Sequence, residues 1–203
     1  MHPYATNSPA PPKHIAYMML ASVALSAGAG ALINHANASL GWTMGSVSAM
    51  TVFTILYFAF DRAVWRWRWA RRILLVPDLT GTWQCEGKTL FKGGASHEIV
   101  WTGTLTIRQS WSRIRILLKT SQSGSESIAA SVYEEPGNGF RLIYHYDNKP
   151  ALGEKDLGRH CGLCNLLFDE NIETASGEYF TDKDRMTAGT MKLTKGAAAN
   201  AKT

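Results

Sequence analysis

The feature that most constrains this chain is an uncharged stretch from Ile15 to Phe60. Within it, Ile15–Ile33 and Trp42–Phe60 are two apolar runs of 19 residues each, separated by Asn34–Gly41. A helix needs about 20 apolar residues to cross the hydrocarbon core of a bilayer. The pattern therefore predicts a two-helix transmembrane hairpin over residues 14–61. The alternative is a soluble protein with two buried core helices.

The residues that flank the hairpin predict its orientation. One lysine precedes the first run, whereas the second run is followed by five arginines, and basic residues near membrane segments stay on the cytoplasmic side. Tryptophans alternate with the arginines, as is typical at the headgroup level. We expect two spans with both termini in the cytoplasm. A cleaved signal peptide is disfavoured because a second span follows directly. The basic residues are Lys13, Arg62, Arg66, Arg68, Arg71 and Arg72, and the tryptophans are Trp65, Trp67 and Trp69.

Small residues recur every fourth position in both runs. Such spacing lets helix backbones approach closely. Two interpretations remain open: packing of the two helices within one hairpin, and self-association of several copies. The residues are Ser22, Ser26 and Gly30 in the first run and Gly41, Gly45 and Ala49 at the second.

The net charge of +5 is unevenly distributed along the chain. Residues 78–195 contain 14 Lys and Arg against 15 Asp and Glu, a net charge of −1, and the remainder contains 7 against 1, a net charge of +6. The basic residues thus border the membrane segments, where they suit a bilayer with anionic lipids. The charge gives no indication of a DNA or RNA partner.

Composition divides the chain into five parts. Residues 1–13 are rich in proline and predict a disordered leader. Residues 62–77 form a basic and aromatic juxtamembrane linker after the hairpin. Residues 78–195 are long enough for one compact domain, and Pro77 marks its beginning because proline does not continue a helix. Residues 196–203 predict a disordered tail.

Alternating apolar and polar residues predict an all-β domain. About eight short strands are separated by turn residues, with no convincing helix. Eight antiparallel strands in sequence can close into a small calycin-like up-and-down barrel, which removes exposed sheet edges. The expected strands are Leu79–Glu86, Glu98–Gln109, Arg113–Thr120, Ser125–Tyr133, Phe140–Asp147, Cys161–Asp169, Thr174–Thr181 and Met186–Leu193.

The start of the first strand supports the barrel. Gly81-Thr82-Trp83 resembles the Gly-x-Trp opening of calycin barrels such as lipocalins and avidins. That resemblance implies structural roles for Gly81 and Trp83, the tryptophan closing one end of the barrel. It also implies room for at most one small ligand.

The sequence shows no arrangement typical of an enzyme or a metal site. No nucleophile with a base, carboxylate pair or phosphate loop stands out, so we expect no catalytic residue and no cofactor. Cys161 and Cys164 form a C-x-x-C, but in a strand they point to opposite faces. A disulfide or joint metal ligation between them is therefore disfavoured, and Cys85 and His160 would complete at most one further ligand pair.

Aromatic and basic side chains on the strands are the better candidates for a binding site. An arginine binds phosphate through its planar fork, and aromatic faces stack on bases. The alternative is that the aromatic rings fill the core and the arginines face solvent. The candidate ligand-binding residues are Trp101, Arg108, Arg115, Tyr133, Tyr144 and Tyr146.

Two membrane spans, an Arg/Trp border and a small β-rich domain beginning Asp78-Leu79-Thr80-Gly81-Thr82-Trp83 resemble one family. It comprises effectors of bacterial anti-phage cyclic-oligonucleotide signalling (CBASS) of the two-transmembrane, β-strand-rich type, associated with cGAS/DncV-like nucleotidyltransferases. The resemblance implies a bacterial inner-membrane protein whose barrel binds a cyclic dinucleotide. Binding is expected to drive homo-oligomerisation and disruption of the membrane, which kills the infected cell.

Two other functions stay open from the sequence. One is a membrane-tethered calycin-like binder of a small apolar ligand or lipid. The other is a scaffold subunit whose barrel is filled by its own side chains. Ligand polarity separates the first from a nucleotide receptor, because a nucleotide pocket needs inward Arg, Asn or Thr side chains whereas a lipid pocket is apolar throughout.

Overall fold

The computed structural model describes residues 1–6, 11–41, 45–67, 69–70, 74–92, 95–153, 158–183 and 185–196. The chain forms two compact units. One comprises Met1–Asn7 together with Leu75–Thr203, and the other is Ser8–Leu74. Each unit is described by itself.

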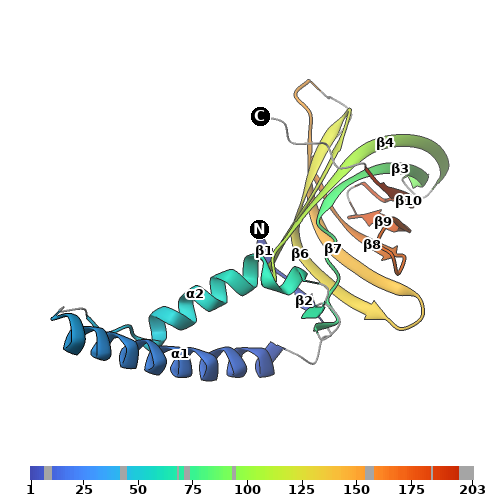
Figure 1. The fold of residues 1–203 in the computed structure, drawn as a ribbon. Helices are drawn as coiled ribbons and strands as arrows, with labels where there is room; N and C mark the ends of the chain where they lie inside the picture. The colour runs from blue at the N-terminus through green and yellow to red at the C-terminus, as the bar shows by residue number, and fades with distance from the viewer. Residues whose placement is uncertain are drawn as a thin grey trace. The chain divides into compact units, whose positions relative to one another are not determined.

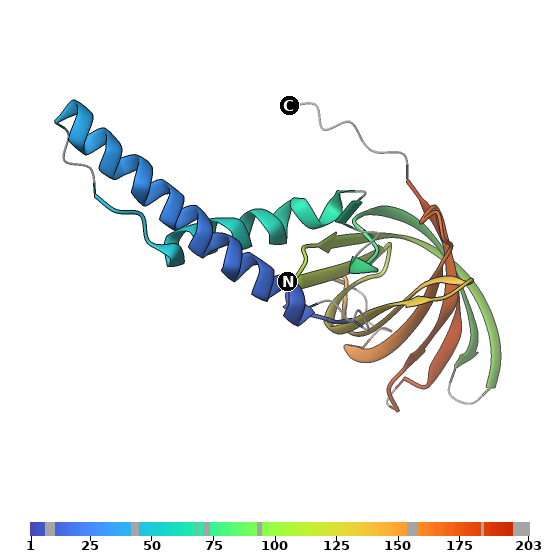
Figure 2. The same ribbon diagram turned by 60° about the horizontal axis from the view of Figure 1, so that its bottom comes forward.

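The larger unit is a barrel of eight antiparallel strands in sequence order (Figures 1 and 2). Each strand pairs with the next one along the chain, and the last pairs with the first, so the sheet closes. The fold class predicted from the sequence is confirmed. The strands are β3 Gly81–Lys92, β4 Ala95–Gln109, β5 Arg113–Thr120, β6 Ser123–Glu135, β7 Gly139–Pro150, β8 His160–Phe168, β9 Thr174–Thr181 and β10 Thr187–Lys195.

The strand limits follow the turn residues most closely where the turns are short. The limits predicted for β5 and β9 match the structure, since Ser110–Ser112 and Asp169–Glu173 separate them from their neighbours. The gaps left between the expected strands at residues 87–97 and 148–160 are too long: β3 continues to Lys92, β4 begins at Ala95, and β7 continues to Pro150. Ladder hydrogen bonds to neighbouring strands hold these polar residues in extended conformation.

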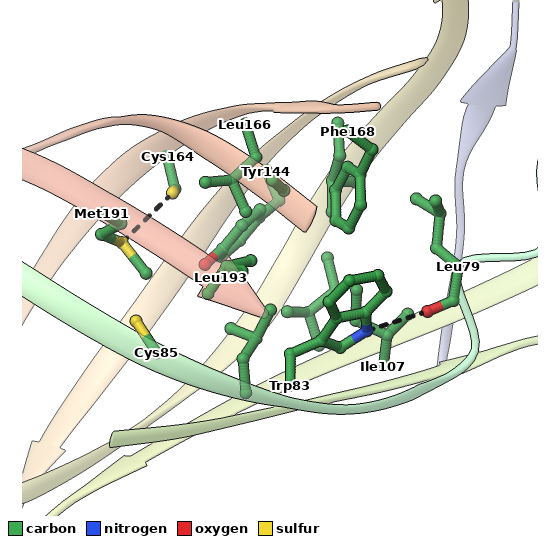
Figure 3. Close-up of a cluster of buried hydrophobic side chains, with 14 of the residues drawn as sticks. Leu79, Trp83, Cys85, Ile107, Tyr144, Cys164, Leu166, Phe168, Met191 and Leu193 are labelled. Atoms are coloured by element: carbon green, nitrogen blue, oxygen red, sulfur yellow. Dashed lines mark hydrogen bonds between the residues drawn. The ribbon is translucent and has the colours of Figure 1, made fainter. Parts of the chain in front are cut away.

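One end of the barrel is filled by a closely packed apolar core. Trp83 is fully buried, its ring meets that of Phe168 edge to face at 5.0 Å, and its Nε1–H donates to the Leu79 carbonyl at 3.2 Å (Figure 3). Gly81 has a φ of +153°, which favours glycine. The Gly-x-Trp opening thus closes this end of the barrel, as the calycin resemblance implies.

The first six residues are part of the barrel, which corrects the prediction of a disordered leader. β1 (His2–Pro3) pairs antiparallel with β5, and β2 (Ala5–Thr6) pairs parallel with β6. Proline-rich composition indicates low intrinsic order, but two available strand edges bind this segment. The remainder of the predicted leader includes the first turn of α1, which begins at Pro11, a favourable first helical position for proline. Residues 7–10 lie outside the described residues.

The smaller unit contains two helices, α1 (Pro11–Leu40) and α2 (Ala49–Arg62). The loop predicted at Asn34–Gly41 is wrong, because α1 continues to Leu40 and ends at Gly41, whose φ is +64°. Ile15–Leu40 is long and apolar enough to span a membrane, and no second helix among the described residues meets that test. α2 has 14 residues and a length of about 21 Å, less than the roughly 30 Å hydrocarbon core.

Residues 45–48, immediately before α2, are not helical. The Ser26 hydroxyl of α1 donates to the carbonyl of Val47 at 2.7 Å, and Ser48 caps α2 by accepting from the Thr51 amide at 3.1 Å. These bonds matter in lipid, where water cannot satisfy backbone groups.

The prediction of a helical face of small residues at the second span is therefore wrong. Gly41 and Gly45 are not helical and only Ala49 lies in α2, because the Ser48 cap sets where that helix begins. In the first run, Ser22 is buried with its hydroxyl donating to the Met19 carbonyl, whereas a methyl group on Gly30 would meet no atom within 4 Å.

The juxtamembrane linker predicted at 62–77 is partly helical. Arg62 ends α2, and Val64–Arg66 forms the short helix η1. Trp67 and Trp69 are exposed and meet edge to face at 6.1 Å, whereas Trp65 is buried. At the other end of the chain, Gly196 donates to the Thr82 carbonyl at 2.8 Å. The rest of the predicted tail, 197–203, lies outside the described residues.

Candidate functional site

The barrel interior changes from apolar to polar along β7 and β8. On β7 the inward residues run Leu142, Tyr144, Tyr146 and Asn148, all buried. The paired strand β8 changes in the same direction, from Phe168 through Cys164 to His160. Because neighbouring strands are antiparallel and in register, like residues meet at the same level. The barrel is therefore closed by apolar packing at one end and lined by hydroxyl, amide and imidazole groups at the other.

A cavity of about 470 Å³ occupies the polar end. Aromatic rings form its inner part, and hydroxyl groups and one arginine surround its outer part. Its principal lining residues are Thr89, Ile99, Val100, Trp101, Thr102, Leu118, Thr120, Gln122, Ser123, Ser125, Tyr144, Tyr146, Asn148, His160, Tyr179, Thr181, Arg185, Thr187 and Met191.

Three aromatic rings lie over glycines on the neighbouring strands. Trp101 is paired with Gly87, Tyr146 with Gly162 and Tyr179 with Gly189. A methyl group on any of these glycines would overlap the ring beside it. The absence of a side chain therefore lets each ring lie along the barrel wall instead of projecting across the interior. Without these glycines the rings would fill the cavity.

The Tyr179 hydroxyl holds the aromatic wall in place. It lies 2.6 Å from the Thr89 hydroxyl and accepts from the Trp101 indole Nε1–H at 3.3 Å. The Trp101 and Tyr179 rings meet edge to face at 5.8 Å. Burial raises the pKa of Tyr144 and that of Tyr146 well above the usual range. Both phenols are therefore neutral at every physiological pH.

The polar side of the cavity combines an amide, an imidazole and a guanidinium. Asn148 and His160 are opposite each other on β7 and β8, both at least nine-tenths buried. The Arg185 Nη1 lies 3.3 Å from His160 Nδ1, and that nitrogen is also 3.0 Å from the Gly158 carbonyl. Burial lowers the pKa of His160, partly opposed by the hydrogen bond to the Gly158 carbonyl, and the nearby Arg185 charge lowers it further against weaker effects of Asp182 and Asp147. The imidazole is therefore neutral at pH 7, and Arg185 carries the positive charge.

One buried donor in this group lacks a protein partner. Among the described residues, the Nδ2 of Asn148 is completely buried without a hydrogen bond. A buried polar group without a partner costs about 1–3 kcal/mol. A ligand that enters the cavity with an acceptor oxygen would remove that cost.

The structure brings together only some of the candidate residues from the sequence. Trp101, Tyr144 and Tyr146 line the cavity. Arg108 is exposed and alternates with buried Ile107 and Gln109, so it faces outward. Arg115 and Tyr133 likewise alternate with buried residues and do not line the cavity. Arg115 forms an ion pair with Glu126 at 2.7 Å on the outside of the barrel.

Sequence reasoning missed Asn148, His160 and Arg185 as a group. Asn148 and Arg185 stand at the limit of β7 and in the turn before β10, positions that appear as polar loops in the sequence. The alternation that places Tyr144 and Tyr146 inward on β7 could have identified Asn148 if it had been extended by one further step.

The cysteines are structural, and the structure describes all three as free. Cys164 points inward, 3.7 Å from the Met191 sulfur (Figure 3). Cys161 alternates with buried residues of β8 and faces outward, which confirms the expected opposite faces. Burial raises the pKa of the Cys85 and Cys164 thiols to about 12, so both are inert. Among the described residues, no three His, Cys, Asp or Glu side chains are close enough to bind a metal ion.

Two family models match the chain and divide it as the structure does. The model described as "Cap15, cyclic dinucleotide receptor domain" matches residues 74–195, and "Cap15, TM helices" matches residues 13–66. The first covers the barrel strands β3 to β10, and the second covers both helices of the smaller unit.

Two curated relatives have the same name, CD-NTase-associated protein 15. The relative from Yersinia aleksiciae is 38% identical over 149 residues, which cover 73% of this chain and 70% of the relative. The relative from Staphylococcus schleiferi is 24% identical over 156 residues, which cover 77% of this chain and 81% of the relative.

The glycines opposite the aromatic rings give a structural prediction. We expect Gly87→Ala to displace Trp101 into the cavity, break its bond to Tyr179, and destabilise the barrel by about 1–3 kcal/mol through overpacking. The indole N–H resonance of Trp101, assigned with Trp101→Phe, should shift. Gly124→Ala is the control, since its added methyl meets only the Leu118 carbonyl, at an ordinary 3.9 Å. An unmoved resonance in Gly87→Ala would contradict this role.

Proposed function

Since the chain belongs to the Cap15 family, we propose that its barrel is the receptor of a membrane-anchored effector in CBASS defence. The cavity binds a cyclic dinucleotide, binding drives homo-oligomerisation, and the assembled helices disrupt the bacterial inner membrane and kill the infected cell. We assign it no catalysed reaction, no cofactor and no DNA or RNA partner.

The chemistry of the cavity suits the two kinds of group in a cyclic dinucleotide. Its phosphodiesters need a cation and hydrogen-bond donors, which Arg185 and the surrounding hydroxyl groups supply. Its bases need flat apolar surfaces with a donor at the edge, which the rings of Trp101 and Tyr144 and the hydroxyl of Tyr146 supply.

The observation that carries this proposal is the buried, unpaired amide of Asn148 at a polar cavity wall. An apolar ligand or lipid would leave that donor unsatisfied and would also bury the Arg185 guanidinium against hydrocarbon. Such burial is unfavourable without compensating hydrogen bonds. The alternative of a lipid-binding barrel is therefore disfavoured.

The path of the chain supports two spans with both termini in the cytoplasm. Residues 1–6 and the residues from 75 onward belong to one unit, so the chain must leave that unit and return to it. If α1 crosses the bilayer, the segment after it crosses back. A short α2 makes that return with the non-helical residues before it, whose Val47 carbonyl is satisfied by Ser26.

Ligand-driven assembly requires a difference in ligand affinity between single and assembled states. A cyclic dinucleotide at the open end of the barrel can supply it by presenting atoms to a second barrel. The exposed apolar surface of α1 then packs in lipid against further copies. The small residues Ser22, Ser26 and Gly30 remain the proposed packing face of that helix.

The test is thermal unfolding of the full chain in detergent with a panel of purine and pyrimidine cyclic dinucleotides. At 100 times its dissociation constant, a ligand should stabilise the barrel by about 2.7 kcal/mol. The same compound should release dye from protein-containing vesicles, and linear dinucleotides should do neither. A folded barrel that shows no shift across the panel would refute the receptor function. A shift without dye release would refute the membrane-disrupting part alone.

Removal of the cavity cation should weaken binding of the active compound. We expect Arg185→Gln to lower affinity about tenfold to a hundredfold, because a hydrogen bond to a charged group contributes about 1.5–3 kcal/mol. Arg108→Gln is the matched control, with the same charge change on the outer face. Titration calorimetry measures both variants, and equal losses would show that the effect is one of net charge.

Binding should also depend on pH through His160. Its pKa is lowered in the ligand-free barrel, and bound phosphodiesters would raise it again. Binding therefore takes up a proton, so affinity is highest below the free-state pKa and falls as pH rises through the bound-state pKa. Each unit of difference between the two pKa values contributes about tenfold. His160→Gln should flatten this profile between about pH 5 and 8, and an unchanged slope would exclude the imidazole.

A further inference from the structure

Two neighbouring strands of the barrel are only partly joined to each other. β5 and β6 pair directly at three positions, from Leu117–Glu126 to Lys119–Gly124. Beyond these, β6 contains a bulge between Ser127 and Ala129, and the two strands no longer pair. We call this opening, between residues 113–116 of β5 and 127–132 of β6, the seam. Its edges present backbone donors and acceptors that a closed barrel would pair.

The first six residues of the chain occupy the seam. His2 and Pro3 pair with Ile114 and Arg113 on one edge, and Ala5 and Thr6 pair with Ser131 and Val132 on the other. Figure 1 shows β1 and β2 beside β6. We call residues 1–6 the strap. It has only two paired residues on each edge, so it is held more weakly than any of the eight barrel strands.

A buried serine connects the strap with both edges. Ser127 Oγ accepts from the Ile116 amide of β5 at 2.9 Å and lies 2.7 Å from the Nε2 of His2. Ser125, two residues earlier on the same inward face of β6, lines the cavity. β6 therefore both lines the cavity and holds the strap.

A buried glutamine connects the strap with the segment that enters the barrel after the helical unit. Gln109 is 2% exposed, and its Nε2 donates to the Tyr4 hydroxyl and to the Pro77 carbonyl, both at 3.0 Å. Its Oε1 accepts from the Leu79 amide at 2.9 Å. Six residues lie between Tyr4 and α1, and two lie between the end of the helical unit and Pro77. Both segments that lead to the helices thus meet at one side chain.

We propose that the seam is a strand-acceptor site for the strap, and that release of the strap is how an event in the cavity reaches α1. Ligand at Ser125 repositions β6, the contacts at Ser127 and His2 break, and the strap leaves the seam. Thr6 is separated from α1 by residues 7–10, at most about 14 Å of chain, so release removes a tether from that helix. The inference rests on the proposed function for the event in the cavity.

The first test locks the strap by a disulfide. Pro3 and Arg113 are paired and both exposed, so Pro3→Cys with Arg113→Cys can be bridged by oxidised glutathione without change to the cavity. The full chain is placed in dye-loaded vesicles with the cyclic dinucleotide that gives the largest thermal shift. We expect the oxidised double variant to keep that shift but to release dye at least tenfold more slowly, with recovery on reduction. Each single cysteine variant is the control, and equal release before and after reduction would overturn the proposal.

A second test needs no ligand and separates this inference from the receptor function. Deletion of residues 2–6 removes the strap, and the milder Tyr4→Ala weakens its attachment by removing the hydroxyl that accepts from Gln109. Each should raise dye release several-fold in the absence of any nucleotide while the barrel still unfolds cooperatively on heating. Folded variants that release no more dye than the parent protein refute strap release as the trigger, whatever the panel of nucleotides shows. If neither variant folds, the disulfide-bridged Pro3→Cys/Arg113→Cys variant decides the same question.

Discussion

A closed sheet requires every strand edge to find hydrogen-bond partners, and this barrel meets that requirement in two ways. Seven of its neighbouring strand pairs are joined by long ladders, and the eighth, β5 with β6, is joined by three residue pairs and completed by the chain's own first residues. Unpaired backbone groups in an apolar wall are costly, so the seam cannot stay empty without a penalty. The least stable part of the wall is consequently the part that continues into a membrane helix.

The same barrel separates stability from recognition along its axis. Trp83, Phe168 and their neighbours form a dense core at one end, which is enough to hold the sheet closed. The other end is free to contain an unpaired amide, a neutral imidazole and a cation. Glycines on β3, β8 and β10 make this division possible, because they let aromatic rings lie against the wall between the two ends. A single methyl group at any of them would overlap the neighbouring ring and disturb the wall of the cavity.

The sequence allowed the barrel, its strand order and three of the cavity residues to be predicted, because alternation reports which face each residue occupies. This alternation correctly placed Trp101, Tyr144 and Tyr146 inside the barrel. The same alternation places Arg108 and Arg115 outside, although both were chosen as candidate phosphate ligands. Arg185 could not be placed, since it lies in a turn where no periodicity applies. The strap was missed for a different reason: its order comes from edges more than a hundred residues away. The length of α2 was missed because hydropathy does not report where the Ser48 cap begins a helix.

The position of the strap also has a consequence for biosynthesis. His2 and Pro3 leave the ribosome before the helices, yet their partners Arg113 and Ile114 emerge only after both helices have been made. Contacts so distant in sequence form slowly, because a long loop must close before they contribute. This segment therefore has to wait unpaired while α1 and α2 are made. Synthesis of the helices and completion of the barrel wall are in this way ordered in time by translation itself.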